Sequence, residues 1–333
     1  MNVPSLVFVL FLGLAGIRVF AQVTAPDLYT KEYNSGNFPN ALALAREAIK
    51  AEPNGWRPYY IAGVASLQLG KERDGVKMLE KAVALNGSSA EARAALAYGY
   101  LLRNNKKATD EADEALKLDK KNPEANYVLA AMAIRNETYN VAYDRSKAAI
   151  AASPKMSVAY FTKSQSLVSS FIKQRGTVLK NESRAEMLNE AAADLEEFLR
   201  LQPQNKNVQF YREYIESLRF FAEYYSRSEN KLPDADAAAG TMEPNRTSLK
   251  IISRQRAPYT DAARSAGIQG TVMLLVGFSS DGTVKHVLLT KPLGYGLDEG
   301  AVAAARAMKF EPETIDGKAV STVRPVSFTF NIR

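Results

Sequence analysis

The sequence contains no cysteine and only one histidine, His286, among its 333 residues. Without cysteine, the chain has no disulfide framework, no thiol nucleophile and no cysteine-bound metal. With a single histidine, histidine metal clusters and serine–histidine triads are hard to build. Glycine-rich phosphate loops and nucleophile elbows are missing as well. We therefore expect a protein that is not an enzyme and needs no cofactor or metal, with His286 packed or solvent-facing on a strand.

Carboxylates that lie close together in the sequence are the remaining catalytic candidates. They occur at Asp298 and Glu299, and at Asp194 near Glu196 and Glu197. Both groups fall in segments with a helical pattern, where carboxylates ordinarily face solvent. We expect them to be solvated.

A dense run of basic residues is also absent, although the net charge is +7 and the sequence pI is about 9.3. Lysines and arginines are scattered over predicted helix faces and are not interleaved with aromatic residues. This distribution favours a mildly basic exported protein over one that binds nucleic acid.

The N-terminus carries an apolar run, Leu6–Ile17, that is shorter than the roughly 20 residues of a membrane-spanning helix. Val19 and Ala21 occupy the −3 and −1 positions of a cleavage before Gln22, as in a secretory signal peptide. We predict that residues 1–21 are removed and that the protein is exported to a bacterial periplasm. The alternative is an uncleaved inner-membrane anchor that ends near Val23 and faces the periplasm.

Similar short segments recur 34, 33 and 34 residues apart, centred on Ala48, Ala82, Ala115 and Ala149, and each is followed by a helix-stop signal. A fifth copy begins at Ser157 and is interrupted by an apparent insertion, residues 175–190. The pattern predicts helix pairs over residues 22–227.

This pattern resembles the tetratricopeptide repeat (TPR), a helix–turn–helix unit with small residues where its two helices cross. The matching positions are Gly63, Ala97 and Ala130 on first helices and Ala41, Gly75, Ala108 and Ala142 on second helices. The resemblance implies an α-solenoid whose concave groove holds peptides or partner proteins. Tyr59, Asn126 and Tyr160 are candidate groove residues, although packing roles are equally consistent with the sequence.

The repeats end in a predicted long helix, residues 208–227, that is rich in aromatic residues. It either caps the last repeat or presents a face to a partner or membrane. Residues 228–248 lack apolar periodicity and contain Pro233, Gly240 and Pro244, which predicts a flexible linker.

A small module follows at residues 249–333, where the apolar period changes to 2. We predict an α-β-β-α-β order with a three-stranded antiparallel sheet, so the chain is mainly α with a small α+β domain. The predicted elements are a helix at 258–267, strands at 270–278 and 284–292, a helix at 297–310 and a strand at 319–333. Asp281-Gly282 supplies the hairpin turn.

Residues 258–332 resemble the TonB C-terminal domain family. The motifs that carry the resemblance are Pro258-Tyr259, Gly270-x-Val272, Asp281-Gly282-x-Val284, Leu297-Asp298 and Phe310-Glu311-Pro312. Thr260 stands where the family usually has proline, and Met308 stands where an aromatic residue is common.

The resemblance implies that the module binds a short extended segment of an outer-membrane transporter or receptor by adding it to a sheet edge. The expected edge residues are Val326, Ser327, Phe328, Thr329, Phe330, Asn331 and Ile332, with Tyr259 and Arg306 as further candidates. We predict a non-enzymatic periplasmic adaptor that binds protein partners through both modules. The alternative is a membrane-anchored TonB-like energy transducer, which would need a retained N-terminal helix and a proline-rich spacer.

The export hypothesis predicts that the mature chain begins at Gln22. Intact-mass measurement of the protein, expressed with its own N-terminus in a Gram-negative host, checks this. A chain that retains Met1 and sediments with the inner membrane would contradict cleavage and favour the anchored alternative.

Overall fold

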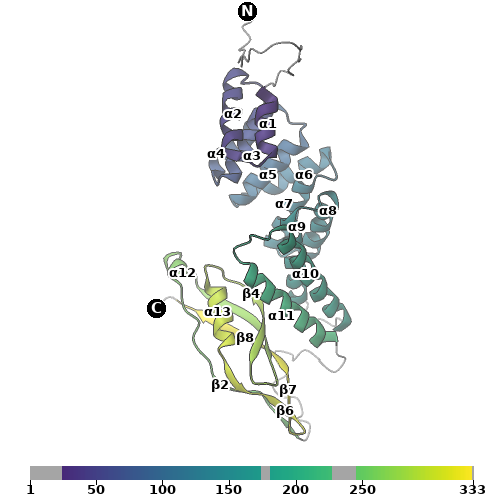
Figure 1. The fold of residues 1–333 in the computed structure, drawn as a ribbon, viewed down its shortest axis with the longest axis vertical. Helices are drawn as coiled ribbons and strands as arrows, with labels where there is room; N and C mark the ends of the chain where they lie inside the picture. Colours follow the sequence, from purple (N-terminus) through teal and green to yellow (C-terminus); the bar gives the residue numbers. More distant parts are fainter. Residues whose placement is uncertain (1–24, 174–180, 227–244, 332–333) are drawn as a thin grey trace, which may run out of the picture. The chain divides into compact units, whose positions relative to one another are not determined.

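A computed structural model describes residues 25–173, 181–226 and 245–331 (Figure 1). The predicted signal peptide, most of the predicted linker, part of the predicted insertion and Ile332 lie outside the described residues. Among the described helices, none combines the length and apolar character that a membrane span requires. The chain divides into two compact units, one up to Asn86 and one from Gly87 onward.

The first unit consists of two helix pairs. Its elements are α1 (Ala25–Asn34), α2 (Phe38–Ala51), α3 (Trp56–Gln68) and α4 (Glu72–Leu85). The crossing of α3 and α4 is close because both helices have glycine there. A Cβ atom on Gly75 would lie 2.9 Å from the Gly63 carbonyl oxygen and 2.6 Å from Leu67 Cδ2. The predicted small residues of this pair are therefore confirmed as packing residues.

The second unit begins with further helix pairs. Its helices are α5 (Ala90–Leu102), α6 (Lys107–Leu118), α7 (Pro123–Arg135), α8 (Tyr139–Ala152), α9 (Ser157–Lys173), α10 (Asn181–Leu201) and α11 (Val208–Ser226). The four predicted crossing residues of these helices, Ala97, Ala108, Ala130 and Ala142, are fully buried. Ser89 and Asn122 cap α5 and α7, each accepting a hydrogen bond from a backbone N–H of the first turn. A described part of the predicted insertion is helical, because α10 already begins at Asn181.

The C-terminal module is built on a three-stranded antiparallel sheet in the order β4-β3-β8. Its principal elements are α12 (Asp261–Ser265), β3 (Gly270–Phe278), β4 (Val284–Lys291), α13 (Leu297–Arg306) and β8 (Thr322–Phe330). The predicted α-β-β-α-β order is confirmed. Thr260, at the proline position of the family pattern, caps α12 by accepting a hydrogen bond from Ala263 N–H.

The module also contains short strands that the sequence did not predict, and they form two separate small sheets. They are β1 (Arg246–Thr247), β2 (Lys250–Ser253), β5 (Lys309–Glu311), β6 (Glu313–Ile315) and β7 (Lys318–Val320). The predicted helix 297–310 was too long, because β5 pairs with β2 in place of a last helical turn. The predicted strand 319–333 is likewise divided, because β7 turns back on β6. Strand β1 lies inside the predicted linker and pairs with β6.

One face of the sheet forms the core of the module. Val272, Leu274 and Val276 of β3 are fully buried in a cluster with Leu297 and Ala301 of α13. Ala304, Ala305 and Met308 belong to the same cluster, which confirms the predicted inward stripe of this helix.

The opposite face of the sheet packs on α11. Leu275 of β3 and Leu288 of β4 are fully buried in the same cluster as Leu218 and Phe221 of α11. Figure 1 shows α11 beside β4, in agreement with the contacts between them. Because α11 also packs on α10, it both closes the helix pairs and carries the module.

A close approach in this interface occurs at a glycine of β3. A Cβ atom on Gly277 would lie 2.7 Å from Cε1 of Phe220. The same phenylalanine ring stacks on His286 of β4, with ring centroids 4.2 Å apart and an interplanar angle of 13°. Ser217 of α11 accepts a hydrogen bond from Val287 N–H at 3.4 Å. The packed role expected for His286 is therefore what the structure shows.

This geometry predicts that Gly277→Val separates the sheet from α11. The added side chain overlaps the Phe220 ring, and overpacking of this kind costs about 1–3 kcal/mol. Hydrogen exchange in α11 and β4 should speed up accordingly, whereas Met273→Val, on an exposed position of the same strand, should leave it unchanged. Adding Phe220→Ala to Gly277→Val should restore part of the protection, and unchanged exchange in the single variant would contradict the interface.

Candidate functional site

Strand β8 is an edge of the principal sheet. It pairs with β3 along its whole length, from Gly270↔Phe330 to Phe278↔Thr322. Within the described ranges, no strand pairs with its other side. Pro325 fits such a strand, because proline lacks the N–H that a central strand would need for a second partner. Among the described residues, the part of the predicted edge from Val326 to Asn331 therefore has a strand partner on one side only.

Alternate residues of β8 direct their backbone groups away from β3. The Val323 carbonyl accepts a hydrogen bond from the Arg324 guanidinium at 3.2 Å, and the Ser327 carbonyl accepts one from Arg254. Successive residues of a strand point their N–H and C=O groups to opposite sides. The backbone groups of Ser327 and Thr329 therefore point outward, as does the carbonyl of Pro325.

The two halves of this edge differ. At Val323 the backbone hydrogen-bonds Tyr224 of α11, and Pro325 has no N–H to offer. From Ser327 to Asn331 the backbone carries both donors and acceptors. Within the described residues, the part of the edge that can pair with another strand therefore lies between Ser327 and Asn331, inside the predicted run Val326–Ile332.

The side chains of β8 are of two kinds, apolar ones in the core of the module and exposed polar ones. Phe328 and Phe330 are buried in the module core, and Val326 packs against it. Ser327, Thr329 and Asn331 are exposed. A partner strand would thus be recognised mainly through the backbone, while the aromatic side chains hold β8 in register.

A pocket of about 560 Å³ lies beside this half of the edge. It is lined by Arg254, Gln255, Arg256, Ala257, Tyr259, Phe328, Thr329, Phe330 and Asn331. The Tyr259 ring stacks on Phe330 with centroids 6.0 Å apart, and its hydroxyl donates to the Ile268 carbonyl at 2.5 Å. The structure therefore places Tyr259, one of the further candidates, against the edge strand.

Arg306 lies elsewhere. It is on α13 and forms an ion pair with Glu213 of α11, where it lowers the pKa of that carboxyl. It also lines a small pocket between α11 and the sheet with Phe210 and Tyr214. Arg306 therefore belongs to the contact that holds the module on α11 and not to the β8 edge.

The candidate groove residues of the helix pairs have local contacts. The Asn126 side chain is buried, donates to the Asn122 carbonyl at 2.9 Å and accepts from Arg145 at 3.2 Å. The Tyr160 hydroxyl donates to the Pro154 carbonyl at 3.2 Å. Tyr59 is half-buried. The contacts of Asn126 are those of a packing residue.

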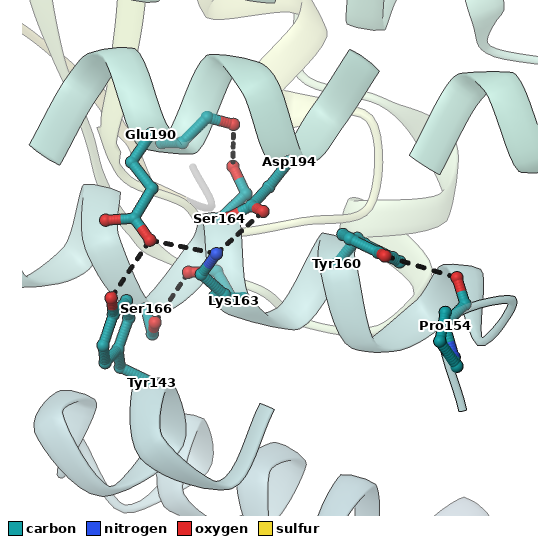
Figure 2. A network of polar contacts seen from close by, with 9 residues as sticks. Tyr143, Pro154, Tyr160, Lys163, Ser164, Ser166, Glu190 and Asp194 are labelled. Atoms are coloured by element: carbon teal, nitrogen blue, oxygen red, sulfur yellow. Dashed lines mark hydrogen bonds and ion pairs between the residues drawn. The ribbon is translucent and has the colours of Figure 1, made fainter. Parts of the chain in front are cut away.

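A buried polar cluster connects α8, α9 and α10. Figure 2 shows Lys163 between Asp194 and Glu190, with nitrogen–oxygen distances of 2.9 and 3.0 Å. Tyr143 donates its hydroxyl hydrogen to the same Glu190 oxygen at 3.0 Å. The expectation that Asp194 is solvated was wrong: it is 6% exposed, and its Oδ2 atom is buried without a hydrogen bond. The helix pattern does not show this, because the burial comes from α9.

The pKa values in this cluster favour a structural ion pair. Burial raises the pKa of Asp194 to about 6, against the opposing effect of Lys163. Burial alone would lower the pKa of Lys163, but its two carboxylate partners more than offset this and raise it. A lysine that is held protonated is neither a nucleophile nor a base. The cluster therefore cross-links three helices.

The other carboxylate pair and the histidine also have structural roles. Asp298 accepts hydrogen bonds from the N–H groups of Leu293 and Gly294 at 2.8 and 2.9 Å, which fixes the loop before α13. Burial lowers the pKa of His286, which keeps the stacked ring neutral. Within the described residues, no three His, Cys, Asp or Glu side chains are grouped as metal ligands.

Residues 255–332 match the family model described as the Gram-negative bacterial TonB protein C-terminal. The chain is 40% identical over 89 residues to "Protein TonB" of two strains of Xanthomonas campestris pv. campestris. The match covers 25% of this chain and 40% of each relative, so the chain spans less than half the length of these relatives. The resemblance of the C-terminal module to this domain family is confirmed.

Solved structures of helical repeat proteins are similar to the N-terminal part. MamA is 21% identical with a TM-score of 0.38, over 56% of this chain and 93% of its own. A thermophilic TPR protein of Thermus thermophilus is 16% identical with a TM-score of 0.44, over 59% and 97%. YrrB, described as a TPR protein with an unusual peptide-binding site, is 14% identical with a TM-score of 0.38, over 57% and 90%.

Asp194 makes the stability of the helical part depend on pH. Burial raises the pKa of Asp194 from 3.8 to about 6 in the folded protein, so the protonated carboxyl favours folding. The stabilisation that comes from proton binding is fully present below pH 3.8 and is lost as the pH rises through 6. As the pH falls from 7 to 4, the free energy of unfolding of wild type relative to Asp194→Asn should rise by on the order of 2 kcal/mol. Urea unfolding of both proteins at each pH measures this. A constant difference would show that Asp194 does not titrate in this range.

Proposed function

We propose that this protein is a non-enzymatic periplasmic adaptor that binds an extended peptide segment of an outer-membrane protein by strand addition to β8. The observation that carries the proposal is the outward backbone of Ser327 and Thr329, beside a pocket and with no strand partner in the described part of the chain. A TonB C-terminal domain joined to helix pairs supports a role in protein–protein interaction.

Strand addition is favoured because both faces of the sheet are covered and the outward backbone of β8 is not paired with a strand in the described part of the chain. One face of the sheet is covered by α13 and the second face by α11, so neither presents a broad apolar surface to a partner. The outward N–H and C=O groups of β8 are hydrogen-bonding groups that an extended peptide can pair with. Backbone pairing supplies affinity, and the neighbouring pocket supplies contacts for alternate side chains of the peptide.

The helix pairs would then bind a second protein. Stacked helix pairs present extended surfaces that are suited to peptides or partner domains. Because α11 packs both on α10 and on the sheet, the second unit connects this surface to the peptide edge through continuous packing. An adaptor of this design binds its two partners through different parts of one chain.

A membrane-anchored transducer for outer-membrane transport is the second candidate. The observation that favours it is the match to proteins named TonB. In that case residues 1–23 would be retained as an anchor, and the mass of the mature chain separates the two functions. Both candidates use the same peptide edge.

The proposal predicts different behaviour for two substitutions at Thr329. Thr329→Pro removes an outward N–H, and the fold should tolerate it because Pro325 already occupies an equivalent outward position. Thr329→Ala keeps the N–H and loses the same hydroxyl contact to Thr271. A peptide selected from a displayed library of random eight-residue sequences should bind the proline variant about ten-fold more weakly than the alanine variant, because one backbone hydrogen bond is lost and the ring obstructs approach.

Fluorescence anisotropy of the labelled peptide with the full chain measures this difference, and circular dichroism verifies that both variants are folded. Equal affinity for the two variants would contradict strand addition at β8. So would failure to select any peptide that binds the wild-type protein.

A further inference from the structure

The only histidine of the chain lies inside the contact between α11 and the sheet of the C-terminal module. The His286 ring stacks on Phe220 of α11 with the ring centroids 4.2 Å apart. The packing around the two rings is tight, because a Cβ atom on Gly277 would lie 2.7 Å from Cε1 of Phe220 and 3.5 Å from Cβ of His286. A side chain that gains a charge near neutral pH therefore occupies a packed interface.

The charged form of this ring has no partner in the interface. In the described ranges, the His286 side chain has the ring contact to Phe220 but neither a hydrogen bond nor an ion pair. An imidazolium has two N–H donors, and a buried charge without a partner is costly. Protonation of His286 therefore favours a state in which the ring reaches water.

The charges near His286 do not offset the effect of burial. Lys285 of β4 and Arg306 of α13 disfavour a positive ring, whereas Glu216 of α11, which is exposed, favours one. Strand β3 carries no charged residue. Burial has the largest effect and lowers the pKa of the ring.

Helix α9 also contacts β4, but its charged groups are bound to other residues. Its lysines are Lys163 and Lys173. Lys163 pairs with the Asp194 carboxylate, and Lys173 donates a hydrogen bond to the Glu137 carbonyl. Helix α9 therefore supplies no carboxylate to a protonated His286.

From this geometry we infer that the contact between α11 and the sheet is a pH-sensitive switch, in which protonation of His286 favours release of the sheet from α11. The apolar cover of Leu275 and Leu288 keeps the released state a minor one, and acid raises its population. Release takes up one proton, because the ring becomes charged only where it reaches water. This inference goes beyond the proposed function and does not depend on strand addition.

Two other carboxyl groups of this part of the chain respond differently to acid. Protonation of Asp194 stabilises the folded helices as the pH falls, which is the opposite sign. The Arg306 guanidinium lowers the pKa of Glu213, so the ion pair between α11 and α13 persists between pH 7.5 and 5.5. Release on acidification in this range therefore has the sign expected for the histidine alone of these three groups.

A titration of the His286 ring tests the first step. Because the chain has one histidine, the ring signals of the full chain, prepared without a histidine tag, are identified directly in an NMR spectrum. The midpoint in the folded protein should lie below that of the same chain unfolded in urea. A midpoint equal to or above that of the unfolded chain would overturn the inference.

Amide hydrogen exchange tests the release itself. Protection factors of α11 and β4, corrected for the intrinsic pH dependence of exchange, should fall by up to about ten-fold between pH 7.5 and 5.5, the limit for one proton at an ordinary histidine. His286→Phe keeps a ring beside Phe220 that cannot be charged, so its protection should not depend on pH. Glu216→Gln removes a carboxylate that favours the charged ring and should enlarge the loss.

The remaining outcomes each decide one step. Wild-type protection that stays constant between the two pH values would show that protonation does not release the sheet. An equal loss in wild type and His286→Phe would assign the effect to another group, and either result overturns the inference. If circular dichroism shows that His286→Phe does not fold, His286→Leu, which also cannot be charged, takes its place.

Discussion

The packing of the sheet between α13 and α11 is the constraint on which the rest of the structure depends. From Leu274 to Phe278, consecutive residues of β3 are buried, so this strand is apolar on both faces. The helix α13 covers one face, and the second face requires apolar cover from outside the module. The helix α11 supplies it. With both faces covered, the outward backbone of β8 from Ser327 onward is the part of the sheet that can still pair with another strand.

This constraint connects the two kinds of architecture in the chain. The aromatic residues of α11 have two sets of neighbours, α10 on one side and the sheet on the other. The close contact of Phe220 with Gly277 and His286 accounts for the glycine near the end of β3. It also gives the single histidine a stacking role. The buried Lys163 cluster links α8, α9 and α10, and α10 in turn packs on α11.

Much of this fold is visible in the sequence, because its signals are local. Recurring alanines near Ala48 and Ala82 mark helix pairs, and Asp281-Gly282 marks the hairpin. Pairings between distant segments were missed: β1 and β2 join strands more than 50 residues away. Asp316-Gly317, with positive φ at both residues, is a hairpin signal that could have revealed β6 and β7. Of the site, the edge strand and Tyr259 were predictable, but Arg254 was not, since its position depends on the β2–β5 pairing.

The most direct test of the central claim is amide hydrogen exchange at single residues of β8, with and without a bound peptide. In the free protein the Phe328 N–H faces β3 and should already be protected, whereas the Ser327 and Thr329 N–H groups should exchange rapidly. Binding should protect Ser327 and Thr329 and leave Phe328 unchanged. Protection that appears elsewhere in the chain, with Ser327 and Thr329 still exchanging freely, would contradict recognition at this edge.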